Sequence, residues 1–507
     1  MFFSNSGRSE FRGVNMVHKI GVAVLGAGLL LNVLAMEGPT AVYKPLNFGG
    51  FSEFGSLQSG QYANNKRFND EWVDHFGAYI AQTVQSGDDL AFDIGLGGVF
   101  VFQKRELIHS TWGGSQYKNF FVGPSVADIR YGASAGNGKT FGLQFGMFTE
   151  KYNPDANNLG EYLFRSGTYP DYVTSGGIWF VNNTSVQLQA LKASYKAGAF
   201  TSDYFLITET SLPALYDISA AAVVEYKMGD GLLDLGAGIN FKHMIPVKPS
   251  LTSSHNSSNA YFTKDGVDYT GYDAFYSERK NFYGRRQVED SANASKYKAL
   301  AVVDSINSAN VKTWLKDPVA AGITPKYFTQ QGLIVMARAS LDLKKIIHSE
   351  AFGPNDMRLY AEGAILGIQN YPVYYTHITE RMPLMAGFNI PCFKFLDLLS
   401  AQVEYFNSPY LNSYLELVRS SSGIPTSPLG SDVRRSKTEY GDITKNDNLA
   451  WSFLAKKTLG GAAFVSAQVA RDHIRTVSID TWTAPEPNEV LGNKSDWYWM
   501  IQFGFGI

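Results

Sequence analysis

Cysteine, charge and long apolar runs are all scarce in this 507-residue sequence. The single cysteine, Cys392, excludes an intrachain disulfide and a cysteine-based zinc site. Charged residues make up only 18% of the chain and sum to a formal net charge of -2, so nothing points to a nucleic-acid partner. The histidines show no paired ligand spacing, and GxSxG and phosphate-loop motifs are missing. We therefore expect no metal, no cofactor and no enzymatic activity.

Only one stretch, near the N-terminus, approaches the length of a membrane span. Ile20–Leu34 is apolar, basic residues precede it, and a small residue stands just before Met36. This order is typical of a secretory signal peptide, here predicted over residues 1–35. A start at Met16 would give a more compact signal than a start at Met1. The alternative is an N-terminal membrane anchor, although the run is short for a span of ~20 residues.

Aromatic residues and glycine are abundant, with 29 Tyr, 34 Phe and 49 Gly, a composition that favours many strands over many helices. A strand with one face in lipid and the other toward a lumen must alternate apolar with polar or small residues over ~9–11 positions. Ser185–Lys196 alternates poorly, which indicates a bulge or a misread segment. The clearest alternation is in Phe92–Phe102, Leu233–Lys242, Leu333–Lys344 and Leu399–Tyr405.

Short and long connections between these segments alternate along the chain. Asn137-Gly138 and similar pairs form short turns because they tolerate positive φ. The longest polar connections lie near 150–184, 244–331 and 407–448. Short periplasmic turns and long external loops are typical of outer-membrane barrels. We therefore predict that residues 36–507 form an all-β fold, a single antiparallel transmembrane β-barrel of about 16 strands, within a range of about 14 to 18.

A soluble β-sandwich or β-helix is the alternative fold, because its strands would also alternate. Such a fold would not require short and long connections to alternate, nor aromatic residues at the strand ends. The interfacial girdle of a membrane barrel requires aromatic residues there. Those near the predicted ends are Trp72, Tyr226, Phe241, Tyr405, Trp451 and Trp497.

The sequence ends on an apolar strand in which every second residue from Trp497 is aromatic or aliphatic. These residues are Trp499, Ile501, Phe503, Phe505 and Ile507. The segment resembles the terminal strand that bacterial outer-membrane proteins present to the barrel-assembly machinery. In that family the last residue is usually Phe, so Ile507 departs from the pattern and Phe505 would take the aromatic role. The alternative is an edge strand of a soluble sheet, where such an apolar strand would promote aggregation.

The layout as a whole resembles the general bacterial porins in its signal peptide, its strand number and its terminal strand. The resemblance is architectural, covers nearly the whole mature chain and includes no porin-specific motif. It implies a location in the bacterial outer membrane, contact with lipid and lipopolysaccharide, and assembly as a homo-oligomer. It also implies passive diffusion of small hydrophilic solutes. The alternative functions are a plugged barrel with a surface-binding or structural role, and an enzyme with its site on the barrel rim.

In porins the third external loop folds into the lumen and narrows it. The third long loop here is Glu150–Thr184, so the resemblance implies that its charged groups set the width and the field of the pore. An ordinary surface loop is the alternative, since only the position of the loop supports a constriction. The candidate constriction residues are Glu150, Asp155, Glu161, Arg165 and Asp171.

Charges of both signs fall on the predicted inward faces of the strands. Wall side chains cannot fill a barrel of this width, which favours a water-filled channel lined by charge. The alternative is a filled lumen in which salt bridges cross-link the wall. The candidate pore-lining residues are Asp93, Asp128, Arg130, Glu225, Lys227, Asp234, Lys242, Arg338, Asp342, Arg358, Glu362 and Glu404, with Lys456 on the same face.

Met244–Gln331 is long for a loop and is the best candidate for a plug or a recognition surface. Its aromatic and basic residues suit contact with a glycan or lipopolysaccharide, or packing of the loop on itself. Within it, Ala292–Ile306 has helical character. A rim enzyme would need a histidine paired with a nucleophile, and the sequence indicates no such pair. The candidate histidines are His75, His109, His377 and His473.

Overall fold

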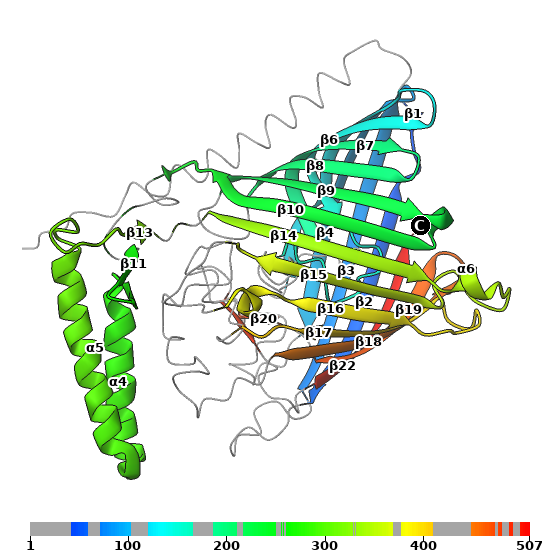
Figure 1. The fold of residues 1–507 in the computed structure, drawn as a ribbon. Helices are drawn as coiled ribbons and strands as arrows, with labels where there is room; N and C mark the ends of the chain where they lie inside the picture. The colour runs from blue at the N-terminus through cyan, green and yellow to red at the C-terminus, as the bar shows by residue number, and fades with distance from the viewer. Residues whose placement is uncertain are drawn as a thin grey trace, which may run out of the picture.

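Sixteen strands form a closed antiparallel β-barrel, as the sequence predicts (Figure 1). This computed structural model describes residues 42–58, 71–102, 120–165, 186–209, 216–249, 255, 257, 260–327, 329, 331–368, 377–408, 448–471, 475–478, 486–489 and 497–506. The barrel strands are β2 (Asn47–Gln58), β3 (Glu71–Ser86), β4 (Leu90–Phe102), β5 (Phe120–Ser134), β6 (Lys139–Glu150), β7 (Val186–Ala197), β8 (Phe200–Thr208), β9 (Ile218–Met228), β10 (Leu233–Ile245), β14 (Gly332–Asp342), β15 (Arg358–Leu366), β16 (Leu384–Asn389), β17 (Leu398–Tyr405), β18 (Leu449–Leu459), β19 (Ala463–Arg471) and β22 (Trp497–Gly506). No helix within the described ranges is long and apolar enough to cross a membrane.

Pairing between the first and the last barrel strands closes the sheet. Strand β2 pairs with β22 from Gly49↔Gly506 to Gln58↔Trp497, and with β3 on its other side. The short strand β1 (Val42–Tyr43) adds to β3 outside this ring. Closure is essential in lipid, because unpaired backbone groups at an open sheet edge would have no water to bind.

The two faces of the barrel wall differ in polarity, as the alternation of the sequence requires. On β10, Leu235 and Ile239 point outward and are about two-fifths exposed, whereas Asp234 and Asn240 point inward and are buried. The same register continues across the neighbouring strand, where Ala339 and Val335 lie beside Leu235 and Ile239. An apolar outer surface and a polar inner surface are what a barrel in a lipid bilayer needs.

Short turns gather at one end of the barrel, called here the short-turn end. Asn137 and Gly138, with φ of 51° and 71°, form the turn between β5 and β6. Positive φ at both positions matches the strand twist of a two-residue hairpin. Two connections at this end are longer: 343–357, which contains α6 (Lys344–Ile347), and 390–397. The opposite, long-loop end holds the longer connections, including the short elements η4 (Ile378–Arg381), β20 (Arg475–Ser478) and β21 (Glu486–Glu489).

The connection between β10 and β14 folds as a separate unit beyond the long-loop end (Figure 1). It contains a small sheet of three strands, β11 (Ala260–Lys264), β12 (Val267–Thr270) and β13 (Lys326–Tyr327). Two helices, α4 (Asp273–Glu289) and α5 (Ala294–Trp314), lie between β12 and β13 in the sequence and are joined by the short turn η3 (Ser291–Asn293). The helix expected near residues 292–306 is confirmed. The described residues of this unit lie outside the barrel and do not plug it (Figure 1). The unit has its own apolar core, made by Tyr261, Phe262, Phe275, Tyr276, Val311 and Ile323.

Inside the barrel, a large aromatic side chain lies across a glycine of the neighbouring strand. Tyr360 on β15 is 2% exposed, and its hydroxyl lies 2.7 Å from Ser400 Oγ. A Cβ atom at Gly387 on β16 would overlap the Tyr360 ring. Because the ring is buried and its hydroxyl is hydrogen-bonded to Ser400, it has little room to move aside for a larger residue at position 387.

We therefore expect Gly387→Val to destabilise the folded barrel by about 1–3 kcal/mol through overpacking. Gly132→Val is the matched control, since nothing lies within 4 Å of a Cβ built there. The fraction of protein that keeps its folded mobility during electrophoresis after graded heating measures the difference. Equal melting of the two variants would contradict the tight contact at Gly387.

Candidate functional site in the barrel lumen

Residues 151–165, called here the inner loop, follow β6 and pack inside the barrel against one wall. Their main polar anchor is Glu362 on β15, which is 2% exposed. The Tyr152 hydroxyl donates to Glu362 Oε1 at 2.6 Å, and Asn153 Nδ2 donates to Oε2 at 2.6 Å. The backbone N–H of Tyr162 donates to Oε1 at 2.9 Å. A buried carboxylate requires such donors, so the wall and the loop each satisfy the other.

A second anchor lies on β17, next to the first. Gln402 Oε1 accepts hydrogen bonds from the backbone N–H groups of Asn158 and Leu159, at 3.0 and 3.3 Å. The Tyr162 hydroxyl donates to Glu404 Oε2 at 2.7 Å. These contacts join loop residues to wall residues that are more than 200 positions away in the sequence.

An ion-pair chain fixes the side of the inner loop that is nearer the short-turn end. Arg358 Nη1 lies 3.0 Å from Asp155 Oδ1, and its other terminal nitrogen lies 3.6 Å from Asp342 Oδ2. At the other end of the loop, Asn240 Nδ2 donates to the carbonyl oxygen of Leu163 at 2.8 Å. The loop is thus attached to β10, β15 and β17.

Apolar side chains fill the space between the inner loop and the wall. Tyr162, Leu159 and Leu163 are at most 1% exposed. Phe164 stacks edge-on against Phe205 of β8, with ring centroids 5.1 Å apart. The wall side of this core comes from β6–β9, β14–β16 and β18, through residues such as Phe148, Leu188, Ile207, Val223, Met336, Met385 and Ala450. One side of the lumen is therefore a packed core.

Glu161 is the most perturbed charge in the inner loop, where it is 2% exposed. Its Oε1 accepts the Asn153 backbone N–H at 3.1 Å, and its Oε2 has no hydrogen-bond partner among the described residues. Burial raises the pKa of Glu161 to about 8, Lys151 and Arg165 lower it, and Glu362 raises it further. Burial likewise lowers the pKa of Lys151. The loop thus carries groups whose charge depends on how it is packed.

Of the predicted constriction residues, Asp155, Glu161 and Arg165 all lie buried in the inner loop, and Arg165 Nη1 donates to the Asn158 carbonyl oxygen at 3.1 Å. Glu150 ends β6 and pairs with Lys192 at 2.8 Å. Asp171 lies outside the described residues.

The predicted pore-lining residues fall into two groups. Glu362, Glu404 and Arg358 hold the inner loop, as described above. The others lie in ion pairs or hydrogen bonds along the wall, or close to them: Arg338–Glu225 at 2.8 Å, Lys227–Glu225 at 3.2 Å, Lys242–Glu209 at 3.3 Å, Lys344–Asp342 at 3.9 Å, Arg130 with Asp93 and with Asp128, and buried Asp234. Many of these charges are thus neutralised within the wall.

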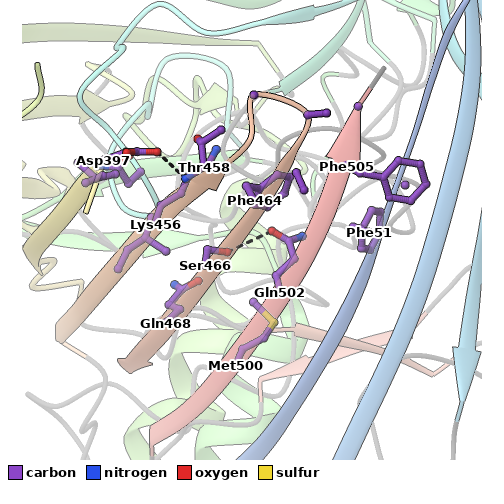
Figure 2. A pocket seen from close by; sticks show the side chains of 18 of the residues that line it. Phe51, Asp397, Lys456, Thr458, Phe464, Ser466, Gln468, Met500, Gln502 and Phe505 are labelled. Carbon is purple, nitrogen blue, oxygen red and sulfur yellow. Dashed lines mark hydrogen bonds between the residues drawn. The ribbon is translucent and has the colours of Figure 1, made fainter. Parts of the chain in front are cut away.

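A cavity of about 660 Å³ remains beside the inner loop, on the side where β18, β19, β22 and β2 form the wall. Lys151 and Asn157 border it from the loop. Figure 2 shows polar side chains from neighbouring strands along it, with Ser466 Oγ 3.4 Å from Gln502 Oε1. Other lining residues are Phe51, Tyr79, Lys456, Phe464, Gln468 and Met500.

Sequence reasoning missed the uncharged residues that hold the inner loop, namely Tyr152, Asn153, Asn158 and Gln402. It also missed a buried pair at the long-loop end, where His243 Nδ1 lies 3.2 Å from Asp217 Oδ2 and both side chains are fully buried. A break in the pairing of β10 with β9 places His243 there. No signal in the sequence brings these segments together.

The candidate rim histidines give no catalytic arrangement in the described residues. His377 donates its backbone N–H to Glu380 Oε2 at 3.2 Å and begins a short helical turn. His109 and His473 lie outside the described residues, and His75 is placed only as part of β3. On the terminal strand, Phe503 is 55% exposed on the outer face, whereas Ile507 lies outside the described residues.

No family model and no curated protein matches the chain. Solved structures of similar arrangement include OprB of Pseudomonas putida, which is 10% identical, with 92% of this chain and 94% of that chain covered and a TM-score of 0.41. The outer membrane channel DcaP of Acinetobacter baumannii is 9% identical, with 93% and 100% covered and a TM-score of 0.40. A mutant of the Rh. blastica porin is 8% identical, with 92% and 100% covered and a TM-score of 0.39. At such values the function has to be argued from the lumen itself.

Glu362→Gln tests the anchor of the inner loop. An amide keeps the size of the side chain but presents an NH2 group to a donor, so a loop hydrogen bond is lost. We expect amide exchange in residues 151–165 to become roughly tenfold faster or more. Asp93→Asn, which neutralises a wall carboxylate away from the loop, is the control. Hydrogen-exchange mass spectrometry of both folded variants measures the exchange rate of residues 151–165. Equal rates in the two variants would contradict the role of Glu362 as the anchor.

The raised pKa of Glu161 predicts that the packing of the inner loop depends on pH. Between its ordinary value of 4.5 and about 8, the packed loop binds more protons than the released loop. The stability that Glu161 contributes is therefore complete below about pH 4.5 and is lost as the pH rises through about 8. Exchange protection of the loop, corrected for intrinsic rates, should fall over this range. Glu161→Gln should abolish the dependence, and an unchanged profile in that variant would refute its origin.

Proposed function

We propose that the protein is an outer-membrane channel for passive diffusion of small hydrophilic solutes, with the inner loop as its constriction. The observation that carries this proposal is the asymmetry of the lumen. The inner loop packs on the wall of β6–β10 and β14–β18, and a cavity lined by both polar and aromatic side chains remains beside it. A loop that fills only part of a wide barrel narrows the lumen and leaves room for solutes beside it.

The charges of the lumen support the same proposal. Asp155, Glu161 and Arg165 act in it by holding the loop in place, because they are buried on the wall side. Lys151 and Asn157, which border the cavity, face the passing solute instead. Among the paired wall charges, Arg130 and Lys227 are about half exposed and can be hydrated, as a water-filled pathway requires.

The outer surface supports a location in the bacterial outer membrane. Apolar side chains such as Phe145, Leu206 and Phe453 are exposed on the outside of the barrel, where lipid would cover them. Contact with lipopolysaccharide, export through a cleaved signal peptide, delivery of β22 to the barrel-assembly machinery and homo-oligomeric assembly belong to this proposal. They rest on the sequence pattern and on the porin-like architecture.

Refolded protein in planar bilayers should produce stepwise increases in conductance, because each inserted barrel adds one water-filled pathway. Heat-modifiable mobility of the same sample serves as the control for folding. Bilayers that stay sealed at every load of folded protein would overturn the proposal. Protein that has lost its fold by boiling should give no steps.

A further inference from the structure

One positively charged side chain that lines the lumen cavity has no neutralising partner in the described wall. Lys456 on β18 is exposed toward the cavity, and its ammonium lies 4.6 Å from the centroid of the Phe464 ring. Within the described part of the chain, Lys456 has no ion-pair partner. It differs in this from the wall cations Arg338, Lys242 and Arg358, each of which has a carboxylate within 3.3 Å.

The one described carboxylate that borders the cavity is already engaged. Asp397, at the short-turn end, accepts the Thr458 backbone N–H at 2.5 Å (Figure 2). It also lies 3.4 Å from Lys457 Nζ. The hydrogen bonds to Thr458, together with Lys457, lower the pKa of Asp397, so it stays ionised and paired with its neighbours. It therefore leaves the charge of Lys456 uncompensated.

A second ammonium borders the cavity from the inner loop. Lys151 Nζ donates to the Ala156 carbonyl oxygen at 2.6 Å. Burial is the main cause that lowers the pKa of Lys151. The neighbouring cations Arg165 and Lys456 lower this pKa further, whereas the carboxylates Glu161 and Asp155 raise it. Lys151 and Lys456 border the same cavity, and their like charges disfavour each other. An anion between them would relieve that repulsion.

Flat aromatic surfaces line the same cavity. Phe51, Tyr79 and Phe464 each lie against a glycine of the neighbouring strand, at Gly77, Gly49 and Gly504 respectively. Phe51 is buried, whereas Tyr79 and Phe464 are partly exposed, so the latter two rings present a face to the lumen. The cavity thus combines apolar ring surface with two ammonium groups and the amides of Gln468 and Gln502.

We propose that this cavity is a binding subsite for small organic anions that carry a carboxylate on an apolar or aromatic body. The carboxylate would bind between Lys456 and Lys151, and the body would lie on the rings of Phe464 and Tyr79. A volume of about 660 Å³ is in the range of pockets that hold small organic molecules. The inference rests on the proposed channel function, since the lumen is the route by which the anion enters.

Phenylacetate is the probe, and phenylacetamide is its neutral counterpart of nearly equal shape. We expect phenylacetate to block single-channel current at low millimolar concentration or below, and phenylacetamide to have little effect. Lys456→Gln should raise the half-blocking concentration on the order of tenfold, as loss of a charge-assisted hydrogen bond predicts. Lys457→Gln is the matched control. It removes the same charge from the adjacent position, where Lys457 pairs with Asp397 and does not line the cavity.

Equal shifts in the two lysine variants, or equal block by phenylacetamide, would overturn the subsite. Inorganic phosphate tests the apolar body: if it blocks as strongly as phenylacetate, the site recognises charge alone and the proposal is wrong as stated. Calorimetric titration of the folded protein in detergent measures binding without conduction. If phenylacetate binds, loses affinity in Lys456→Gln, and the protein does not conduct, the channel proposal is refuted and the subsite is retained. If the protein conducts but does not bind phenylacetate, the subsite is refuted and the channel proposal is retained.

Discussion

Closure of the sheet between β2 and β22 is the constraint on which the rest of the molecule depends. A membrane-spanning sheet has no water for its edge groups, so every strand needs a neighbour on both sides. Once sixteen strands close, the barrel is too wide for its own side chains to fill. The inner loop fills part of this interior by packing against one wall, and a cavity with both polar and aromatic lining remains along the other.

The inner loop changes what an inward-facing residue must be. Where the loop covers the wall, inward positions are apolar, as at Val186, Leu188 and Ala190 of β7, or they are buried acceptors such as Glu362. This explains the poor alternation of Ser185–Lys196: the strand is regular, but its inward face is apolar up to Ala190, where it meets the loop core, and carries the paired Lys192 beyond it. A polar inner face is expected only where the wall meets water.

Electrostatic balance differs between the two sides of the lumen. Around the loop, Asp155 is ion-paired and Glu362 and Glu404 are hydrogen-bonded, because a buried charge without partners would be strongly destabilising. Glu161, which lacks a partner at Oε2, responds to burial by a raised pKa instead. Beside the cavity that requirement is relaxed, since water can solvate an exposed ammonium. Lys456 can therefore remain charged without a carboxylate partner. Because aromatic rings lie beside it, this charge can bind an anion with an apolar body in the proposed subsite.

The sequence alone determined the barrel, its strand number and the end at which short turns gather, because lipid on one face imposes a period of two and hairpin turns need residues such as Asn137-Gly138. It also marked the inward charges and the third long loop. Only the tertiary structure decided which charges lie open and which are covered. Because the inner loop packs against one wall, Tyr152, Tyr162 and Gln402 form hydrogen bonds between loop and wall, whereas Lys456 on the uncovered wall is exposed. That choice depends on contacts between residues some 200 to 240 positions apart, and no local pattern encodes such contacts.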